Sequence, residues 1–65
     1  MAPQSKVEQV AAIHMEAGRQ ANQAGDYLLA WSEFNACFQE TGLPEARISV
    51  ANMWLKMRKI REAQV

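Results

Sequence analysis

The segment AGDYLLAWSEFNACF, residues 24–38, decides the fold because it joins the end of one helix to the start of another. Gly25 can adopt the left-handed backbone conformation that ends a helix, and Asp26 can cap the helix that follows. Apolar residues then recur every three or four positions, which is the spacing of one helical face. These residues are Tyr27, Ala30, Trp31, Phe34, Cys37 and Phe38. The segment therefore predicts a helical hairpin that packs through an aromatic face on its second helix.

The chain is short for a stable fold. With 65 residues it forms one domain at most, and a chain of this size buries only about 60% of its unfolded surface. Cys37 is the only cysteine and His14 the only histidine, so neither an intrachain disulfide nor a zinc cluster can compensate. We therefore expect a homodimer, or docking on another protein, to complete the fold.

Composition and charge exclude several function classes. The net charge is zero, so the chain lacks the positive field of non-specific nucleic-acid binders. No membrane-spanning apolar run and no secretory signal are visible, which predicts a soluble, cytoplasmic protein. No phosphate-binding loop, metal-ligand spacing or nucleophile motif occurs, so we expect no enzyme activity, no metal and no cofactor. His14 and Cys37 fit a packed histidine and an inert buried thiol better than a ligand and a nucleophile.

A flexible N-terminal tail over residues 1–4 and a single helical domain over residues 5–65 are predicted. Ser5 and Glu8 fit a capping box at the start of a first helix, which runs from about residue 6 to residue 24. Its second half presents small residues inward, so the aromatic side chains of the next helix can approach closely. The predicted inner face consists of Val7, Val10, Ala11, His14, Ala17, Gly18, Ala21 and Ala24.

Two further helices complete an all-α, three-helix architecture. The second is predicted over about residues 27–40, and the third over about residues 44–62. Gly42 suits the position just past a helix end, and Pro44 suits the first turn of the next helix.

The third helix is predicted to have two apolar faces. We expect Ile48, Ala51 and Leu55 to cover the hairpin. The opposite face then has no intrachain partner, and the residue types there are those enriched at protein interfaces. Its residues, Met53, Trp54, Met57 and Ile60 with the adjacent Arg61, are the predicted contact with a second copy or another protein.

The hairpin resembles the tetratricopeptide repeat. Gly18, the triplet Gly25-Asp26-Tyr27, Ala30 and Phe34 stand at the spacings of that family. The resemblance covers about residues 11–58 and implies one repeat followed by the first helix of a second. Repeat proteins of this kind bind peptides on the outer side of the first helix, which implies a peptide-facing role for Ala12, Met15, Arg19 and Asn22.

A weaker similarity links the chain to small bacterial and phage regulators of the PerC and ANR kind. Those proteins follow an α-hairpin with a helix rich in tryptophan and arginine, and Trp54 and Arg58 have a comparable spacing here. The basic residues of the third helix, Lys56, Arg58, Lys59 and Arg61, form a candidate phosphate-binding patch. A helix C-terminus with charges that complement its dipole explains the same residues.

The sequence thus favours a small protein-interaction module: an adaptor, or an inhibitor or modulator of another protein, such as a phage- or plasmid-encoded regulator of a host protein. The alternative is a small transcriptional regulator that contacts DNA through the basic end of the third helix. Zero net charge makes nucleic acid the less favoured partner.

Overall fold

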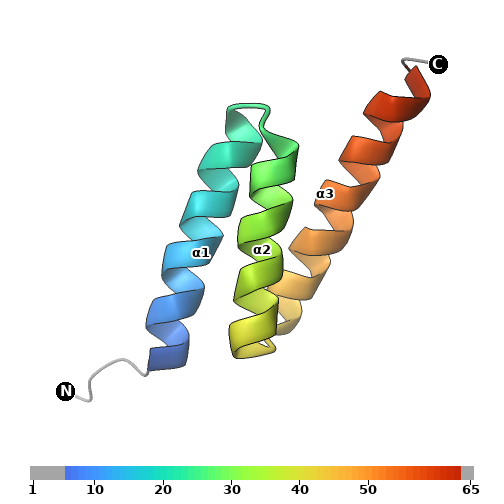
Figure 1. Ribbon diagram of the computed structural model, residues 1–65. Coiled ribbons are helices and arrows are strands. Elements are labelled where there is room, and N and C mark those ends of the chain that lie inside the picture. Colours follow the sequence, from blue (N-terminus) through green and yellow to red (C-terminus); the bar gives the residue numbers. More distant parts are fainter. Residues whose placement is uncertain (1–5, 64–65) are drawn as a thin grey trace.

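The computed structural model describes residues 6–63, which form three helices in an up-down-up order (Figure 1). The helices are α1 (Lys6–Gln23), α2 (Tyr27–Thr41) and α3 (Pro44–Ala63). The all-α prediction is confirmed, and each predicted helix end lies within one residue of the observed end. The predicted tail and the Ser5 cap lie outside the described residues.

The turn between α1 and α2 is built as its sequence predicts. Gly25 has a φ of 82°, which a residue with a Cβ atom adopts only at a cost. The Asp26 N–H donates to the Ala21 carbonyl at 2.9 Å and so closes the end of α1. The Asp26 carboxylate accepts from the Leu29 N–H at 3.2 Å and caps α2. The end of α1 and the start of α2 are therefore fixed by local hydrogen bonds.

Gly18 determines how closely α1 and α2 approach. A Cβ atom placed on Gly18 would lie 2.6 Å from Cζ and 2.7 Å from Cδ1 of Phe34. The Phe34 ring is 3% exposed and rests directly on the α1 backbone. The absence of a side chain at Gly18 is thus what admits the aromatic face of α2.

The core consists of two clusters along α2. The first surrounds the Phe34 ring and contains Ala21, Ala30, Phe34 and Met53, with Met15, Tyr27, Trp31 and Val50 packed against it. The second surrounds the Cys37 thiol and contains Ala11, Cys37 and Ala46, with Met15, Phe38 and Leu43 at its edge. Helix α2 is therefore the central element, and it contacts both of the others.

The turn between α2 and α3 uses a second left-handed glycine. Gly42 has a φ of 69°, and its N–H donates to the Phe38 carbonyl at 2.8 Å. The Thr41 hydroxyl accepts from the Leu43 N–H at 3.2 Å, and Pro44 then begins α3. This short connection returns α3 along the far edge of α2.

The face of α3 that packs on the hairpin differs from the predicted one. Ala46, Val50 and Met53 face the core, and Met53 is only 4% exposed. The prediction that Ile48 and Leu55 cover the hairpin is wrong, since they are 61% and 49% exposed. Ala51, predicted beside them, is also exposed.

The reason for this difference is geometric. Small Ala46 lets α3 approach α2 closely beside Cys37, and the unbranched Met53 fills the space next to Phe34. Apolar residues cover most of the circumference of α3, so periodicity alone could not select the inner face. Two residues of the predicted inner face of α1 are also exposed, namely Val7 at 45% and Ala24, which lies in the turn.

Candidate interaction surfaces

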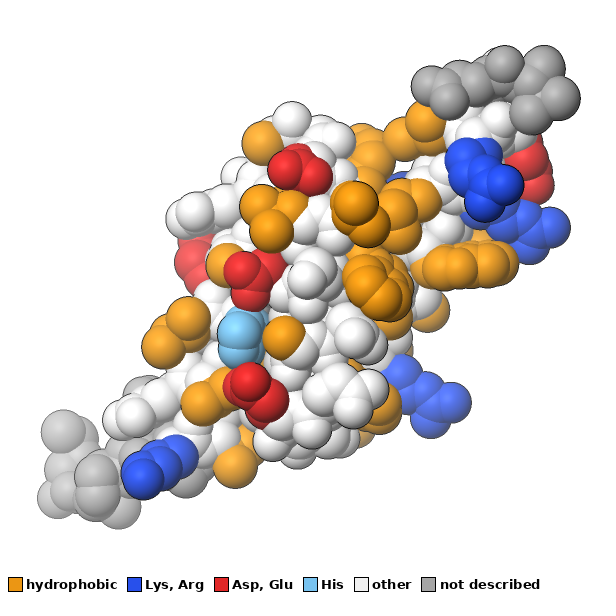
Figure 2. Space-filling model, in the orientation of Figure 1, with side chains coloured by type: hydrophobic (Ala, Val, Ile, Leu, Met, Phe, Trp, Pro, Cys, Tyr) orange, Lys and Arg blue, Asp and Glu red, His pale blue; other side chains and the backbone are white. Residues whose placement is uncertain are grey.

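The C-terminal half of α3 carries a shallow hollow that we call the tryptophan surface. It is lined by Trp54, Met57, Arg58, Arg61 and Glu62. Trp54 is 52% exposed although it is the largest side chain on the helix. Figure 2 shows hydrophobic side chains gathered where the upper parts of α2 and α3 meet, with basic side chains beside them near the end of α3.

Contacts within α3 hold the side chains of the tryptophan surface in place. The Arg58 guanidinium lies over the Trp54 ring, 5.6 Å from its centroid. Arg58 Nε also donates to Glu62 Oε1 at 3.0 Å, in an ion pair across one turn. The Arg58 guanidinium therefore covers one face of the indole, while about half of the Trp54 side chain stays exposed to solvent.

The predicted contact residues of α3 divide into two groups. Met53 does not belong to the outward face, because it is a core residue next to Phe34. Trp54, Met57 and Arg61 line the tryptophan surface, and Ile60 is 41% exposed on the same half of α3. The use of this surface in binding stays a prediction.

Two hollows lie between α1 and α3, and α2 contributes Phe34 to one and Cys37 to the other; we call the two together the furrow. At one end it is lined by Arg19, Asn22, Phe34, Ser49, Asn52, Met53, Leu55, Lys56 and Lys59. At the other end it is lined by Glu8, Ala11, Ala12, Met15, Cys37, Leu43, Glu45 and Ala46. The first end is basic and the second acidic, although the whole chain has no net charge.

All four residues predicted to face a peptide lie in this furrow. Arg19 and Asn22 line its basic end, whereas Ala12 and Met15 line its acidic end. That they bind a peptide stays a prediction. At the basic end the Lys56 ammonium donates to Asn22 Oδ1 at 2.9 Å, and so connects α3 to α1.

The four predicted phosphate-binding cations do not form one patch. Lys56 and Lys59 line the furrow, whereas Arg58 and Arg61 line the tryptophan surface on another side of α3. Lys56 also lies over the Tyr27 ring, 5.4 Å from its centroid. This separation weakens the case for a DNA-binding helix end, because a phosphate backbone would meet only two of the four cations at once.

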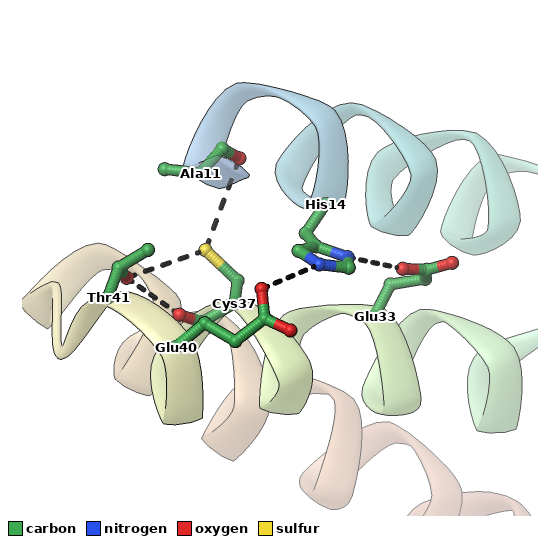
Figure 3. Close-up of polar contacts among 6 residues, drawn as sticks. All are labelled: Ala11, His14, Glu33, Cys37, Glu40 and Thr41. Carbon is green, nitrogen blue, oxygen red and sulfur yellow. Dashed lines mark hydrogen bonds and ion pairs between the residues drawn. The ribbon is translucent and has the colours of Figure 1, made fainter. Parts of the chain in front are cut away.

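His14 joins α1 to α2 through two carboxylates (Figure 3). Its Nδ1 lies 2.8 Å from Glu33 Oε1, and its Nε2 lies 3.2 Å from Glu40 Oε2. The hydrogen bond to Glu33 is the main cause that raises the pKa of His14. The hydrogen bond to Glu40 and the charges of both carboxylates add to it, whereas partial burial opposes it. The protonated ring can donate to both carboxylates, so the three side chains form an ionic clasp between the helices.

The sequence did not reveal this clasp. The sequence predicts a packed histidine at position 14 but gives no partner for its ring. The spacing of seven between the two glutamates places them on one side of α2, which is the signal that could have found them. The clasp contains no nucleophile, and its ring nitrogens are both occupied, which favours a structural role.

Cys37 is fully buried, as predicted, and its thiol lies 4.0 Å from the Ala11 carbonyl and 3.8 Å from the Thr41 hydroxyl (Figure 3). Within residues 6–63, no group of three or more histidine, cysteine or acidic side chains is arranged to hold a metal ion. None of the three described helices combines the length and apolar character that crossing a membrane requires.

Comparisons with known protein families, with curated proteins and with solved structures give no match to this chain. The tetratricopeptide-like and PerC-like relationships therefore stay predictions.

Proposed function

We propose that this chain is a small, non-enzymatic protein-interaction module that binds an acidic segment of another protein through the tryptophan surface. In this role it acts as an adaptor, or as a modulator that occupies a functional surface of its partner. The half-exposed indole of Trp54, held beside Arg58, is the observation that supports the proposal most directly.

The chemistry of the tryptophan surface resembles that of energetically important interface residues. Tryptophan and arginine are the residue types most enriched among side chains that contribute strongly to binding. Trp54 contacts Arg58, which is itself paired with Glu62, and these contacts reduce the side-chain freedom that is lost on binding. The exposed part of the indole offers an apolar anchor site with cations at its rim.

Charge favours a foreign acidic partner over a second copy at this surface. Each copy brings two arginines and one glutamate, and that glutamate is already paired with Arg58. Contact between two copies here would therefore place like charges next to each other. A partner segment with acidic residues beside an apolar side chain complements the same surface.

The proposal is tested with Trp54→Ala, because truncation of the anchor should weaken partner binding by more than about 1 kcal/mol, or roughly fivefold in affinity. Wild-type and variant proteins are used to capture partners from the cells that produce the chain, and each captured protein is then purified and titrated calorimetrically. Ile13→Ala is the matched control, since Ile13 is an exposed apolar residue, 68% exposed, on α1.

Equal affinity of wild type and Trp54→Ala for every purified partner would contradict the proposal. Binding of duplex DNA that falls steeply between about 50 and 200 mM salt would instead support the transcriptional-regulator alternative.

A further inference from the structure

We propose that the furrow between α1 and α3 is a self-association surface, on which a second copy of this chain docks in the antiparallel direction. The inference does not depend on the proposed function, because it concerns a different side of α3. It rests on the lengthwise separation of charge in the furrow and on the parallel course of α1 and α3.

The two ends of the furrow carry opposite charges. Glu8 and Glu45 line one end, and Lys56 and Lys59 line the other. Arg19 adds a further cation at the basic end, where it forms an ion pair with Glu16 of the preceding turn. Among the described residues, Lys56 and Lys59 form no ion pair with an acidic residue of α3. One end of the furrow thus carries two negative charges and the other end carries two positive charges.

Helix geometry produces this separation. α1 and α3 run in the same direction (Figure 1), so their N-termini lie at one end of the furrow and their C-termini at the other. Glu8 and Glu45 lie in the first turns of α1 and α3, where the helix dipole favours acidic residues. The furrow is therefore polar along its length, although the chain has no net charge.

Only one two-fold arrangement pairs these charges. If the symmetry axis ran along the helices, the acidic end of one copy would face the acidic end of the other. If the axis crosses the helices, each copy runs antiparallel to its partner, and each acidic end meets a basic end. The second arrangement also sets the helix dipoles antiparallel across the interface.

In this arrangement the symmetry axis passes near Asn52, which lies midway between Glu45 and Lys59, and about four helical turns separate those two residues. Glu45 of each copy then faces Lys59 of the other, which gives two equivalent ion pairs. Each end of the furrow also offers apolar side chains to a second copy, because Ala12 and Met15 line the acidic end and Leu55 lines the basic end. Contact between the two copies would therefore bury apolar surface as well as pair charges.

A second copy is the occupant that the charges specify most simply. Any foreign occupant would need both signs of charge at a separation of about four helical turns and in the opposite order. The chain itself already has this pattern. Self-association also supplies the additional burial that a domain of this size needs.

A charge-swap experiment tests the inference by sedimentation equilibrium. Glu45→Lys alone places lysine opposite Lys59 in both symmetric contacts, and Lys59→Glu alone places two glutamates opposite each other. Each single variant should dimerise roughly tenfold or more weakly than wild type at low salt. The double variant Glu45→Lys/Lys59→Glu should recover, and an equimolar mixture of the two single variants should form a heterodimer.

Matched controls carry the same charge changes on the other side of α3. Arg61→Glu and Glu62→Lys lie at the tryptophan surface, so they should leave dimerisation unchanged. Circular dichroism of each variant confirms that the helices are retained. High salt should weaken the wild-type dimer, because exposed charges are screened.

Three results would overturn the inference. The first is a wild-type chain that stays monomeric up to about millimolar concentration, the range of very weak association. The second is a pair of single reversals that dimerise as wild type does. The third is loss of dimerisation in Trp54→Ala without loss in the reversals, which would place the second copy on the tryptophan surface.

Discussion

The α1–α2 hairpin and helix α3 are stabilised in different ways. In the hairpin, Gly18 admits the Phe34 ring, Gly25 and Asp26 define the turn, and the His14 clasp connects the helices again. Helix α3 packs through Ala46, Val50 and Met53, and its C-terminal half keeps Trp54 and Ile60 exposed. The geometry of the hairpin thus depends on a few specific close contacts and hydrogen bonds, whereas the position of α3 depends on the packing of apolar side chains.

This difference indicates which part of such a small chain has surface available for binding a partner. A surface that binds a partner has to leave apolar area exposed. The hairpin exposes Ile13, Leu28 and Leu29, but these side chains line neither the tryptophan surface nor the furrow. α3 contributes one side to the core and leaves the rest of its circumference available. The tryptophan surface and half of the furrow both belong to α3.

The largest effect is expected at Gly18. A Cβ atom there would overlap the Phe34 ring, so Gly18→Ala should lower the free energy of unfolding by about 1–3 kcal/mol, and Gly18→Leu by more. Chemical denaturation followed by circular dichroism measures the change. Phe34→Leu combined with Gly18→Ala should recover part of the loss, since the smaller side chain makes room. An unaltered unfolding midpoint in Gly18→Leu would contradict the close packing of the Phe34 ring against Gly18.

The next effect separates the two faces of α3. Met53 is buried and Leu55 is 49% exposed, although they lie two residues apart. Met53→Ala should lower the free energy of unfolding by about 2–3 kcal/mol, because it leaves a cavity beside Phe34. Leu55→Ala should change it by about 0.5 kcal/mol or less.

Both variants are compared at a protein concentration where the chain is monomeric, so that self-association does not contribute. A larger loss of unfolding free energy in Leu55→Ala than in Met53→Ala would show that the Leu55 side of α3 faces the hairpin, as the sequence predicted.

The smallest effect is expected at the His14 clasp, and it depends on pH. The folded-state pKa of His14 is raised above its ordinary value, so the clasp contributes fully below about pH 6.5, the pKa of an unperturbed histidine. The contribution is lost as pH rises through the raised folded-state pKa. Because the side chain is 24% exposed, we expect a loss of up to about 1 kcal/mol between about pH 6 and pH 9.

His14→Gln supplies the comparison, because glutamine keeps a hydrogen-bonding side chain and does not titrate. The pH-dependent part of the stability is the difference between wild type and this variant, measured by chemical denaturation across the same range. A difference that does not change with pH would mean that the clasp is not ionic.

The hairpin could be predicted because its determinants are local in the sequence. Gly25, Asp26 and Gly42 specify turns within a few residues, and the Gly18–Phe34 contact follows from small residues facing aromatic ones. The burial of Cys37 followed from the same face. These features depend on residues whose chemistry admits few alternatives.

The inner face of α3 could not be predicted in the same way. Its choice between Met53 and Leu55 depends on the shape of the space left beside Phe34, which no periodicity encodes. Trp54 and Ile60 are exposed on α3, in agreement with the predicted outward face, whereas Met53 is buried; that this face binds a partner stays a prediction. The polarity of the furrow was missed because it arises from residues on α1 and α3 that are far apart in the sequence.

The linear arrangement of the helices also affects how the chain folds. α1 packs on α2 and α2 packs on α3, whereas α1 and α3 meet at few points. Nearly all contacts thus join neighbours along the chain, and no long loop has to close before stabilising interactions form. Chains with such a low contact order fold on the microsecond to millisecond scale. We therefore expect rapid folding that starts in the hairpin, with α3 joining last.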